Sequence, residues 1–320
     1  MSRIVELDDI HRVLPRIDVV RRMEDGFVAY SGGRVVVPPV GELLFDDPPG
    51  DVHIKYGYIT NDDNFVIKIA GGFYDNPKIG LSSSQGLMLV FSSRTGVLEA
   101  VLLDNGYLTN IRTAAAGAVA AKHLAPHEVR GIGVLGAGIQ AELQLRYAQG
   151  VRPCRRVLFW TPDPAEIDPF VVRFADSDVS IEAASDPGQV AAQCNLIITA
   201  TPSTTPLLRA GDVMSGTHIT AIGSDTADKI ELDPAILGAA DLVVVDSLDQ
   251  SGSRGEVFRA VRAGVLRFDE VRELGHVISG TTGGRSSDAQ ISVCDLTGVA
   301  VQDIQIANAV VGEINSEEGP

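Results

Sequence analysis

A glycine-rich loop is the first part of this 320-residue sequence whose residue types and spacing indicate a chemistry. The loop GAGIQA contains Gly136 and Gly138, follows the apolar run GIGVL and precedes the helical pattern AELQLRYAQ. In this strand-to-helix setting, Gly136 permits a tight turn, Gly138 lets a pyrophosphate approach the backbone, and Ala141 keeps the helix close to the sheet. The start of the helix adds free N–H groups and a positive dipole end. The pattern predicts a dinucleotide site, and a purely structural turn is the alternative.

The residues after the next apolar run, RVLFW, would be expected to include an acidic ligand for the ribose of the dinucleotide. Thr161-Pro162-Asp163 stands there. Asp163, displaced from the usual position, and Thr161 are both candidates for the ribose contact. No arginine directly follows to receive a 2′-phosphate, so NAD is predicted as the cofactor in preference to NADP.

Three charged residues stand at positions where a charge would be unfavourable without a partner or a functional role. Lys68 interrupts the apolar strand NFVIKIAGGF, where burial would lower its pKa; a position on the solvent face is the alternative. Arg112 stands at the head of the Ala-rich helix in TNIRTAAAGA, where the helix dipole opposes a cation. Binding of a carboxylate explains it, and a surface or interdomain salt bridge is the alternative. Asp225 follows an apolar strand in ITAIGSD, at the strand end where α/β sites gather, or is an ordinary turn aspartate.

Composition and charge exclude several classes of protein. The chain has 42 acidic and 26 basic residues and a formal charge of −16, which opposes binding to nucleic acid or anionic lipid. The charged first residues do not resemble a signal peptide, and no apolar segment is long enough to span a membrane, so a cytoplasmic location is expected. Three scattered cysteines suit neither a disulfide framework nor a zinc site, and the histidines have no metal spacing. No metal site is predicted.

The pattern along the chain predicts two domains. Residues 1–112 combine a helical pattern over Asp8 to Tyr30 with strand-like runs, which indicates an α+β unit. From residue 113 to 299, an Ala-rich helix is followed by short apolar runs separated by crossover segments, which indicates a doubly wound parallel sheet of the Rossmann type. Ser185-Asp186-Pro187 has the pattern of a helix start. A last strand and helix follow, and the helix, about 300–320, is expected to return to the first domain. The strand-like runs of the first domain are RVVVPPV, HIKYGY, NFVIKIAGGF and GLMLVF.

Several of these stretches together resemble the ornithine cyclodeaminase/mu-crystallin family over nearly the whole chain. The RTAA block, the GAGxQA loop and the GSD block with its following K and ELD are the most specific of them. The matching stretches are NFVIKIAGGFYDNP, GLMLVFSSRTG, LLDNGYLTNIRTAAAGAVAAKHLAP, GVLGAGIQA, HITAIGSDTADKIELDP and DAQISVCDLTGVAVQD.

The resemblance implies a homodimer of two-domain subunits, in which the first domain binds substrate and forms the dimer and the second binds the dinucleotide. By position, Lys68 and Arg112 match residues that hold the substrate carboxylate and promote chemistry at the α-carbon. Asp225 matches an aspartate that handles the amine in cyclodeaminases. Where ornithine cyclodeaminase has a further carboxylate-binding arginine, this chain reads VVVPPVGELLF, and Lys55 is a candidate for that role. The positions that match cofactor contacts are Thr113, Gly136, Gly138, Ile139 and Gln140.

The activity that the resemblance implies is hydride transfer at the α-carbon of a small amino acid, which converts the amine to an imine. Cyclodeamination of the ornithine-to-proline type, with release of ammonia, is the first expectation, because an acidic Asp225 has a role beside a second amine. The missing arginine puts ornithine itself in doubt. A reductase or dehydrogenase acting on imines, ketimines, alanine, iminosuccinate or pyrroline carboxylate is the alternative, and a binding protein like mu-crystallin is a third.

Overall fold

The computed structural model describes residues 2–73 and 75–318, and its chain divides into two compact units. Unit 1 comprises Met1–Arg112 and Val299–Pro320, and unit 2 comprises Thr113–Gly298. Within the described residues, no helix is both long enough and apolar enough to cross a membrane.

Unit 1 is built on a mixed sheet, which has seven strands in the described part of the chain, in the order β1-β7-β6-β5-β4-β2 with β3 also paired to β4. The β1/β7 pair is parallel and the other pairs are antiparallel. The strands are β1 (Arg3–Glu6), β2 (Val35–Val36), β3 (Gly41–Asp46), β4 (Pro49–Ile59), β5 (Asn64–Phe73), β6 (Ser84–Ser92) and β7 (Leu98–Leu103).

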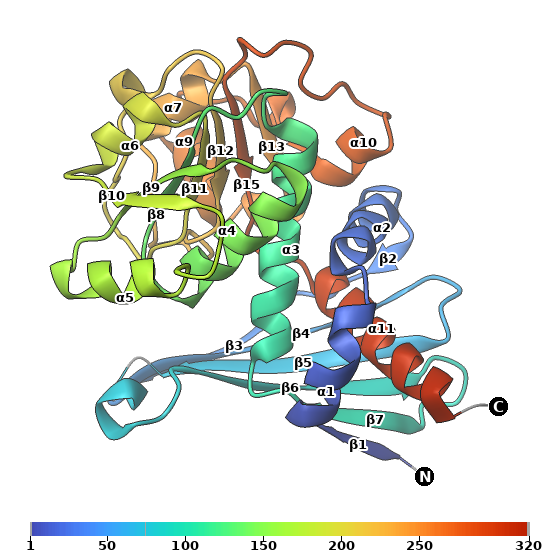
Figure 1. The fold of residues 1–320 in the computed structure, drawn as a ribbon. Helices are drawn as coiled ribbons and strands as arrows, with labels where there is room; N and C mark the ends of the chain where they lie inside the picture. Colours follow the sequence, from blue (N-terminus) through green and yellow to red (C-terminus); the bar gives the residue numbers. More distant parts are fainter. Residues whose placement is uncertain (1, 74, 319–320) are drawn as a thin grey trace. The chain divides into compact units, whose positions relative to one another are not determined.

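Helices α1, α2 and α11 lie on one face of this sheet (Figure 1). Helix α11 packs against α2, β4 and β5, so the last segment of the chain covers strands made near its beginning. The helical elements of unit 1 are α1 (Leu7–Val13), η1 (Leu14–Arg16), α2 (Val19–Ser31), η2 (Asn76–Ile79) and α11 (Ala300–Glu318), and α3 (Tyr107–Leu124) begins in this unit.

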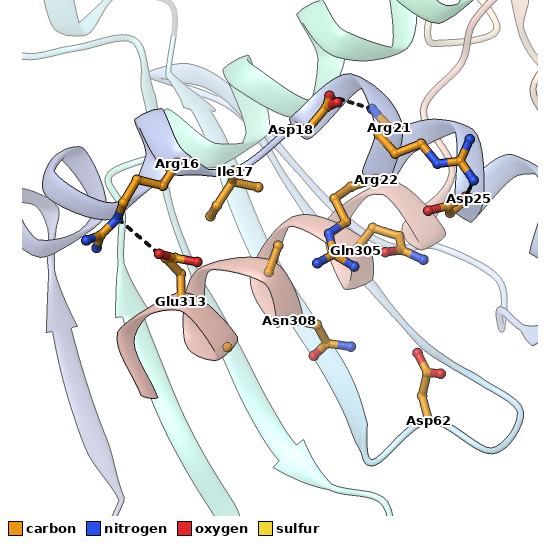
Figure 2. Close-up of a pocket in the computed structure, with 12 residues that line it drawn as sticks. Arg16, Ile17, Asp18, Arg21, Arg22, Asp25, Asp62, Gln305, Asn308 and Glu313 are labelled. Atoms are coloured by element: carbon orange, nitrogen blue, oxygen red, sulfur yellow. Dashed lines mark hydrogen bonds and ion pairs between the residues drawn. The ribbon is translucent and has the colours of Figure 1, made fainter. Parts of the chain in front are cut away.

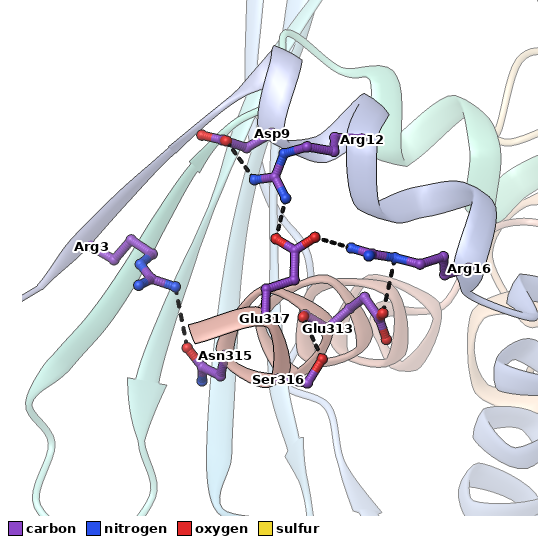
Figure 3. A network of polar contacts seen from close by, with 8 residues as sticks. All are labelled: Arg3, Asp9, Arg12, Arg16, Glu313, Asn315, Ser316 and Glu317. Carbon is purple, nitrogen blue, oxygen red and sulfur yellow. Dashed lines mark hydrogen bonds and ion pairs between the residues drawn. The ribbon is translucent and has the colours of Figure 1, made fainter. Parts of the chain in front are cut away.

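Ion pairs tie the end of α11 to the first helices of the chain (Figure 3). The Glu317 carboxylate accepts hydrogen bonds from both Arg12 and Arg16. Arg16 Nε also lies 3.0 Å from an oxygen of Glu313, and Arg12 reaches Asp9 at 2.7 Å. Because these groups are solvent-exposed, the pairs fix the position of the helix end more than they stabilise the fold.

Unit 2 is the predicted doubly wound parallel fold. In the residues described, its sheet has eight strands in the order β10-β9-β8-β11-β12-β15-β13-β14, and every pairing is parallel. Strands β8, β11, β12, β13 and β15 are buried throughout, as expected when helices cover both faces. The strand order reverses at β8, which makes the carboxyl end of β8 the switch point where such folds bind ligands.

The elements of unit 2 follow one another in strand–helix alternation. The strands are β8 (Ile132–Leu135), β9 (Arg156–Trp160), β10 (Ser180–Ala183), β11 (Leu196–Thr199), β12 (His218–Ala221), β13 (Leu242–Val245), β14 (Arg272–Glu273) and β15 (Ser292–Asp295). The helical elements are α4 (Ile139–Val151), η3 (Pro164–Glu166), α5 (Ile167–Val172), α6 (Pro187–Gln193), η4 (Ala210–Asp212), α7 (Pro234–Ala239), α8 (Leu248–Ser251), α9 (Gly255–Arg262), η5 (Phe268–Glu270) and α10 (Leu274–Ile278).

The local predictions have mixed outcomes. The helix start at Ser185-Asp186-Pro187 is confirmed, because Asp186 accepts a hydrogen bond from Gln189 N at the cap of α6 and Pro187 is the first helical residue. The run RVVVPPV is a strand only at Val35–Val36, because Pro38 and Pro39 cannot donate to a strand ladder. The helical pattern from Asp8 to Tyr30 is interrupted by η1, where Pro15 stands, and gives two helices.

Candidate active site

The glycine loop connects β8 to α4 in the way the sequence predicts. Gly136 has φ of +120°, and a Cβ on it would lie 2.6 Å from the carbonyl oxygen of Ala200, so a side chain is excluded. Gly138 is the N-cap of α4, and a Cβ on it would meet nothing within 4 Å. Ala141 is completely buried. The space over Gly138 and the free N–H groups of the first turn of α4 fit a pyrophosphate.

The other predicted cofactor residues lie around this loop. Ile139 is the first residue of α4 and is exposed, and Gln140 follows it. Gln144, one turn further along, donates from its Nε2 to the Thr113 carbonyl oxygen at 2.9 Å. Thr113 is thereby fixed beside the start of α4.

The end of β9 carries both candidates for the ribose contact. Thr161 directly follows the strand, and its hydroxyl accepts from Asp163 N at 3.3 Å. Asp163 caps η3, since one of its oxygens accepts from Ala165 N at 2.9 Å. The structure therefore gives Asp163 a local role and leaves Thr161 nearer to the strand end.

An arginine does reach the glycine loop, which the sequence argument missed. Arg173 follows α5 and donates from Nη1 to the carbonyl oxygen of Ala137 at 2.9 Å. Its guanidinium also lies 3.7 Å from Glu142 and from Glu166. These two carboxylates offset its charge, so Arg173 fastens the loop instead of presenting a free cation to a phosphate.

In unit 1, Lys68 and Arg112 meet at a shared carboxylate. Lys68 Nζ lies 3.2 Å from Oδ2 of Asp303, and Arg112 Nε lies 3.0 Å from Oδ1 of the same residue. All three side chains are at least nine-tenths buried. Lys68 therefore does not take the solvent-face position, because it shares the inner side of β5 with Val66, and Asp303 comes from α11.

Arg112 does not stand at the head of its helix, so that prediction is wrong. Helix α3 begins at Tyr107, five residues earlier, because Asp104 accepts a hydrogen bond from Leu108 N and caps the helix ahead of the Ala-rich segment. Arg112 Nη1 donates to Oε1 of Gln302 at 2.6 Å. Its Nε faces Asp303 at 3.0 Å, whereas the buried Nε2 of Gln302 makes no hydrogen bond within the part of the chain described. A buried amide donor beside a guanidinium suits an anionic ligand.

The buried charges shift each other's pKa. Burial lowers the pKa of Lys68 to about 7, with Asp303 opposing the shift and Arg112 and Lys55 adding to it. Burial alone would raise the pKa of Asp303, but Arg112 and Lys68 together hold it below its ordinary value. Near neutral pH, Lys68 can therefore both accept and release a proton, while Asp303 stays ionised.

Lys55 lies next to this cluster, opposite Lys68 in the β4/β5 register. It is half-buried, and its charge acts on both Lys68 and Asp303. Three cations therefore surround a single carboxylate, so the cluster has positive charge available for a ligand carboxylate.

Asp225 lies in unit 2, in the loop that follows β12. Its side chain is half-exposed, and its Oδ1 accepts from Lys229 Nζ at 2.7 Å. The hydroxyl of Ser224 donates to the Lys229 carbonyl oxygen at 2.9 Å within the same loop. Asp225 thus forms an ion pair with Lys229 within one loop, and its role at a substrate amine stays a prediction.

Asp303 and Gln302 are the site residues that sequence reasoning missed. Both stand in the run VAVQDIQIANAVV, which predicts a helix and whose start belongs to a stretch matching the family, without indicating a role for either residue. An acidic residue next to a glutamine within a largely apolar helical run is the signal that could have identified them, because buried carboxylates need cationic partners.

A separate polar pocket of about 820 Å³ lies between α2 and α11 in unit 1 (Figure 2). None of the residues predicted to act in catalysis lines it. Helix α11 presents Gln305 and Asn308 to this pocket and Gln302 and Asp303 to the buried cluster. The pocket and the cluster therefore share a helix without sharing a residue.

A family model, curated relatives and solved structures all relate this chain to the same protein family. The model of the ornithine cyclodeaminase/mu-crystallin family matches residues 3–318. An uncharacterized cyclodeaminase of Sinorhizobium fredii is 42% identical, over 95% of this chain and 93% of its own. The alanine dehydrogenase of Archaeoglobus fulgidus is 34% identical, over 96% of this chain and 93% of its own. The crystal structure of the iminosuccinate reductase of Paracoccus denitrificans in complex with NAD+ has a TM-score of 0.91 at 32% identity, covering 99% of this chain and 97% of that one.

Proposed function

Because the chain belongs to the ornithine cyclodeaminase/mu-crystallin family, we propose that it is an NAD-dependent enzyme that transfers a hydride to or from the α-carbon of a small amino acid. The observation that carries the proposal is the buried cluster in which Asp303 contacts both Lys68 and Arg112. A buried cluster of this kind supplies fixed positive charge and a group that can exchange protons near neutral pH.

The side chains of unit 1 divide the work on the substrate. Arg112 and Lys55 bind the α-carboxylate, and the guanidinium fixes its orientation. Gln302 adds a neutral donor beside Arg112. Lys68 accepts the proton that the substrate ammonium must lose before hydride leaves the α-carbon, and returns it in the opposite direction. Asp303 holds both cations in place.

The glycine loop of unit 2 holds the cofactor. Gly136 and Gly138 let the pyrophosphate approach the start of α4. The residues that line this approach are Thr113, Ile139 and Gln140. The ribose is bound by Thr161 or Asp163. NAD, when bound, supplies the carrier of the hydride.

We expect NAD to bind more tightly than NADP, because Glu142 and Glu166 offset the charge of Arg173. Dissociation constants for the two dinucleotides, measured by calorimetry, test this preference. An affinity for NADP equal to or above that for NAD would contradict it.

Cyclodeamination is the first candidate for the fate of the imine. In that reaction a distal amine of the substrate attacks the imine carbon, ammonia leaves, and hydride returns to the same carbon, so no net oxidation occurs. Asp225 is a half-exposed carboxylate that can hold the distal amine. The 42% identity to a protein named as a cyclodeaminase supports this candidate.

A reductase or dehydrogenase is the second candidate, and the position of Lys229 favours it. The Lys229 ammonium lies 2.7 Å from Asp225, where the distal amine of a diamino acid would have to bind. With that place filled, a substrate with a single amine fits better, and the imine would be exchanged with solution. The identity to alanine dehydrogenase supports this candidate.

A two-channel assay separates these candidates. Purified protein would be incubated with NAD and a panel of diamino and monoamino acids, and with NADH and the corresponding imino acids, while ammonia and NADH absorbance are followed. Ammonia without net NADH formation indicates cyclodeamination, whereas net NADH formation from an amino acid or consumption with an imine indicates dehydrogenation or reduction. No turnover with any substrate, together with tight ligand binding, would contradict the proposed enzyme and indicate a mu-crystallin-like binder.

We also propose that unit 1 forms a homodimer through the outer face of its sheet. Phe65 and Phe91 stack there at 4.9 Å, and Tyr56 and Tyr58 on β4 are exposed. An apolar face of this kind is typical of a protein interface. Size-exclusion chromatography with light scattering of Tyr58→Glu should show a shift from dimer to monomer.

A further inference from the structure

The loop of Asp225 is closed across its base by a buried carboxylate. Glu231, at the end of the loop, is completely buried and accepts a hydrogen bond from Gly223 N, at its beginning, at 2.9 Å. Between these two residues the loop carries Asp225 and Lys229. The side chain of Glu231 therefore joins two points that are eight residues apart in sequence.

The same carboxylate holds the end of the neighbouring strand. The hydroxyl of Thr199, the last residue of β11, donates to Glu231 at 2.6 Å. Thr201 donates from its backbone N at 2.6 Å and from its hydroxyl at 2.7 Å. With Gly223, Glu231 accepts four hydrogen bonds from neutral donors, which occupy both of its oxygens.

A second buried carboxylate fixes Glu231 itself. Glu256, in the first turn of α9, accepts from Glu231 N at 2.7 Å and from Leu232 N at 3.3 Å. The N-terminal turn of α9 is held in turn by Asp295, which accepts from Val257 N at 2.9 Å. Glu231 is thereby anchored to α9 and, through it, to the end of β15.

We propose that Glu231 is a positioning residue that holds the loop of Asp225 in one conformation for the reaction. The inference rests on the proposed function, because it takes Asp225 to act on the substrate amine. Glu231 does not touch the reacting atoms; it fixes Gly223 and Thr199, and so determines where Asp225 is presented.

The test compares Glu231→Gln with Asp246→Asn. The glutamine keeps the size but turns an NH₂ group toward donors that need an acceptor, so the loop should loosen. Asp246 is a matched control, since it is also a buried carboxylate at a strand end but accepts from Thr297 and Gly298 instead. Hydrogen exchange of peptides covering 223–230 should quicken about tenfold in Glu231→Gln and stay unchanged in Asp246→Asn.

Activity measurements then connect the loop to the reaction. We expect kcat to fall about tenfold in Glu231→Gln, and the same change in an Asp225→Asn background to alter kcat less than about twofold, because the group being positioned is gone. Equal losses in both backgrounds, or unchanged exchange in Glu231→Gln, would overturn the inference.

The exchange experiment also separates this inference from the proposed function. If Asp225→Asn keeps full activity, the proposed role of Asp225 fails, whereas quickened exchange in Glu231→Gln would still show that Glu231 holds the loop. Should Glu231→Gln not fold, Thr199→Val removes a single donor, and exchange in the loop should then quicken about threefold.

Discussion

The Asp303 carboxylate of unit 1 contacts two buried cations, one through each of its oxygens. Leaving either cation without it would place an uncompensated charge in a buried site. The cluster is thus a unit whose members cannot be exchanged independently.

Arg112→Lys tests the guanidinium. Lysine keeps the charge but loses the planar fork, so we expect kcat/KM to fall about 100-fold, or roughly 3 kcal/mol. NAD affinity should barely change, because the glycine loop is untouched. Steady-state kinetics and NAD calorimetry on the same preparation check both expectations, and full activity would refute the role of Arg112.

The pKa of Lys68, lowered to about 7 by burial, predicts opposite pH profiles for the two directions of reaction. Below this pH Lys68 is protonated and can donate a proton, so kcat/KM for imine reduction should fall as pH rises through about 7. Above it Lys68 is neutral and can accept a proton, so kcat/KM for amino-acid oxidation should rise through the same range.

Lys68→Met removes the titrating group and should abolish most of the activity in both directions. Profiles that lack an ionisation near neutral pH in the wild-type protein would show that Lys68 is not the proton carrier.

At this scale the sequence predicted the charged residues better than their partners. Lys68 and Arg112 stood out because they interrupt apolar segments, where charge is costly. Asp303 lies about 190 residues beyond Arg112, and no local pattern indicates which distant carboxylate meets a buried cation. Tertiary packing decides which distant residues form an ion pair, and the hydrophobic periodicity of the sequence does not indicate it.

Among the elements, the turn between β8 and α4 shows how glycines serve different purposes. Gly136 is required by the fold, since any side chain would strike Ala200. Gly138 has open space where a side chain would point, so the fold itself does not require it.

Gly138→Val is therefore expected to fold normally and to lose NAD binding, because the added side chain occupies the space proposed for the pyrophosphate. Circular dichroism and thermal unfolding establish the fold, and calorimetry measures the affinity. Unchanged NAD affinity in a folded variant would contradict the proposed cofactor site.

Elements with strong periodicity were predicted well. The run NFVIKIAGGF is strand β5 from end to end. The alternation of apolar runs and crossover segments in unit 2 correctly predicted its parallel sheet. The predicted start of α3 lies too far along the chain, because the helix begins at Tyr107 and Leu108, before the alanines that indicate a helix. A cap formed by Asp104 from the preceding segment set the boundary, and composition alone did not indicate it.

At the scale of the whole molecule, buried acids make stability depend on pH. Burial raises the pKa of Glu256 from 4.5 to about 8, with nearby Glu231 adding to the shift, and Asp295 is raised well above its ordinary value. A raised pKa in the folded state contributes stability that is complete below 4.5 and is lost as pH rises through about 8.

Glu256→Gln should flatten this dependence without removing it, since Glu231 and Asp295 remain. We expect the free energy of unfolding of the wild-type protein to fall between about pH 5 and pH 8, by up to about 1.4 kcal/mol per pH unit for a single proton, and that of the variant to fall less. Urea unfolding at several pH values measures both, and parallel curves would contradict the prediction.

The return of the chain to unit 1 through α11 determines the order in which the protein can be completed during translation. Strands β4 and β5, which include Lys68, leave the ribosome early. The helix that covers them leaves only after all of unit 2, and with it the Asp303 carboxylate that contacts Lys68 and Arg112. Until α11 emerges, unit 1 exposes the sheet face that this helix covers, and Lys68 and Arg112 lack the carboxylate of Asp303. Apolar surface exposed in this way makes a folding intermediate prone to aggregation.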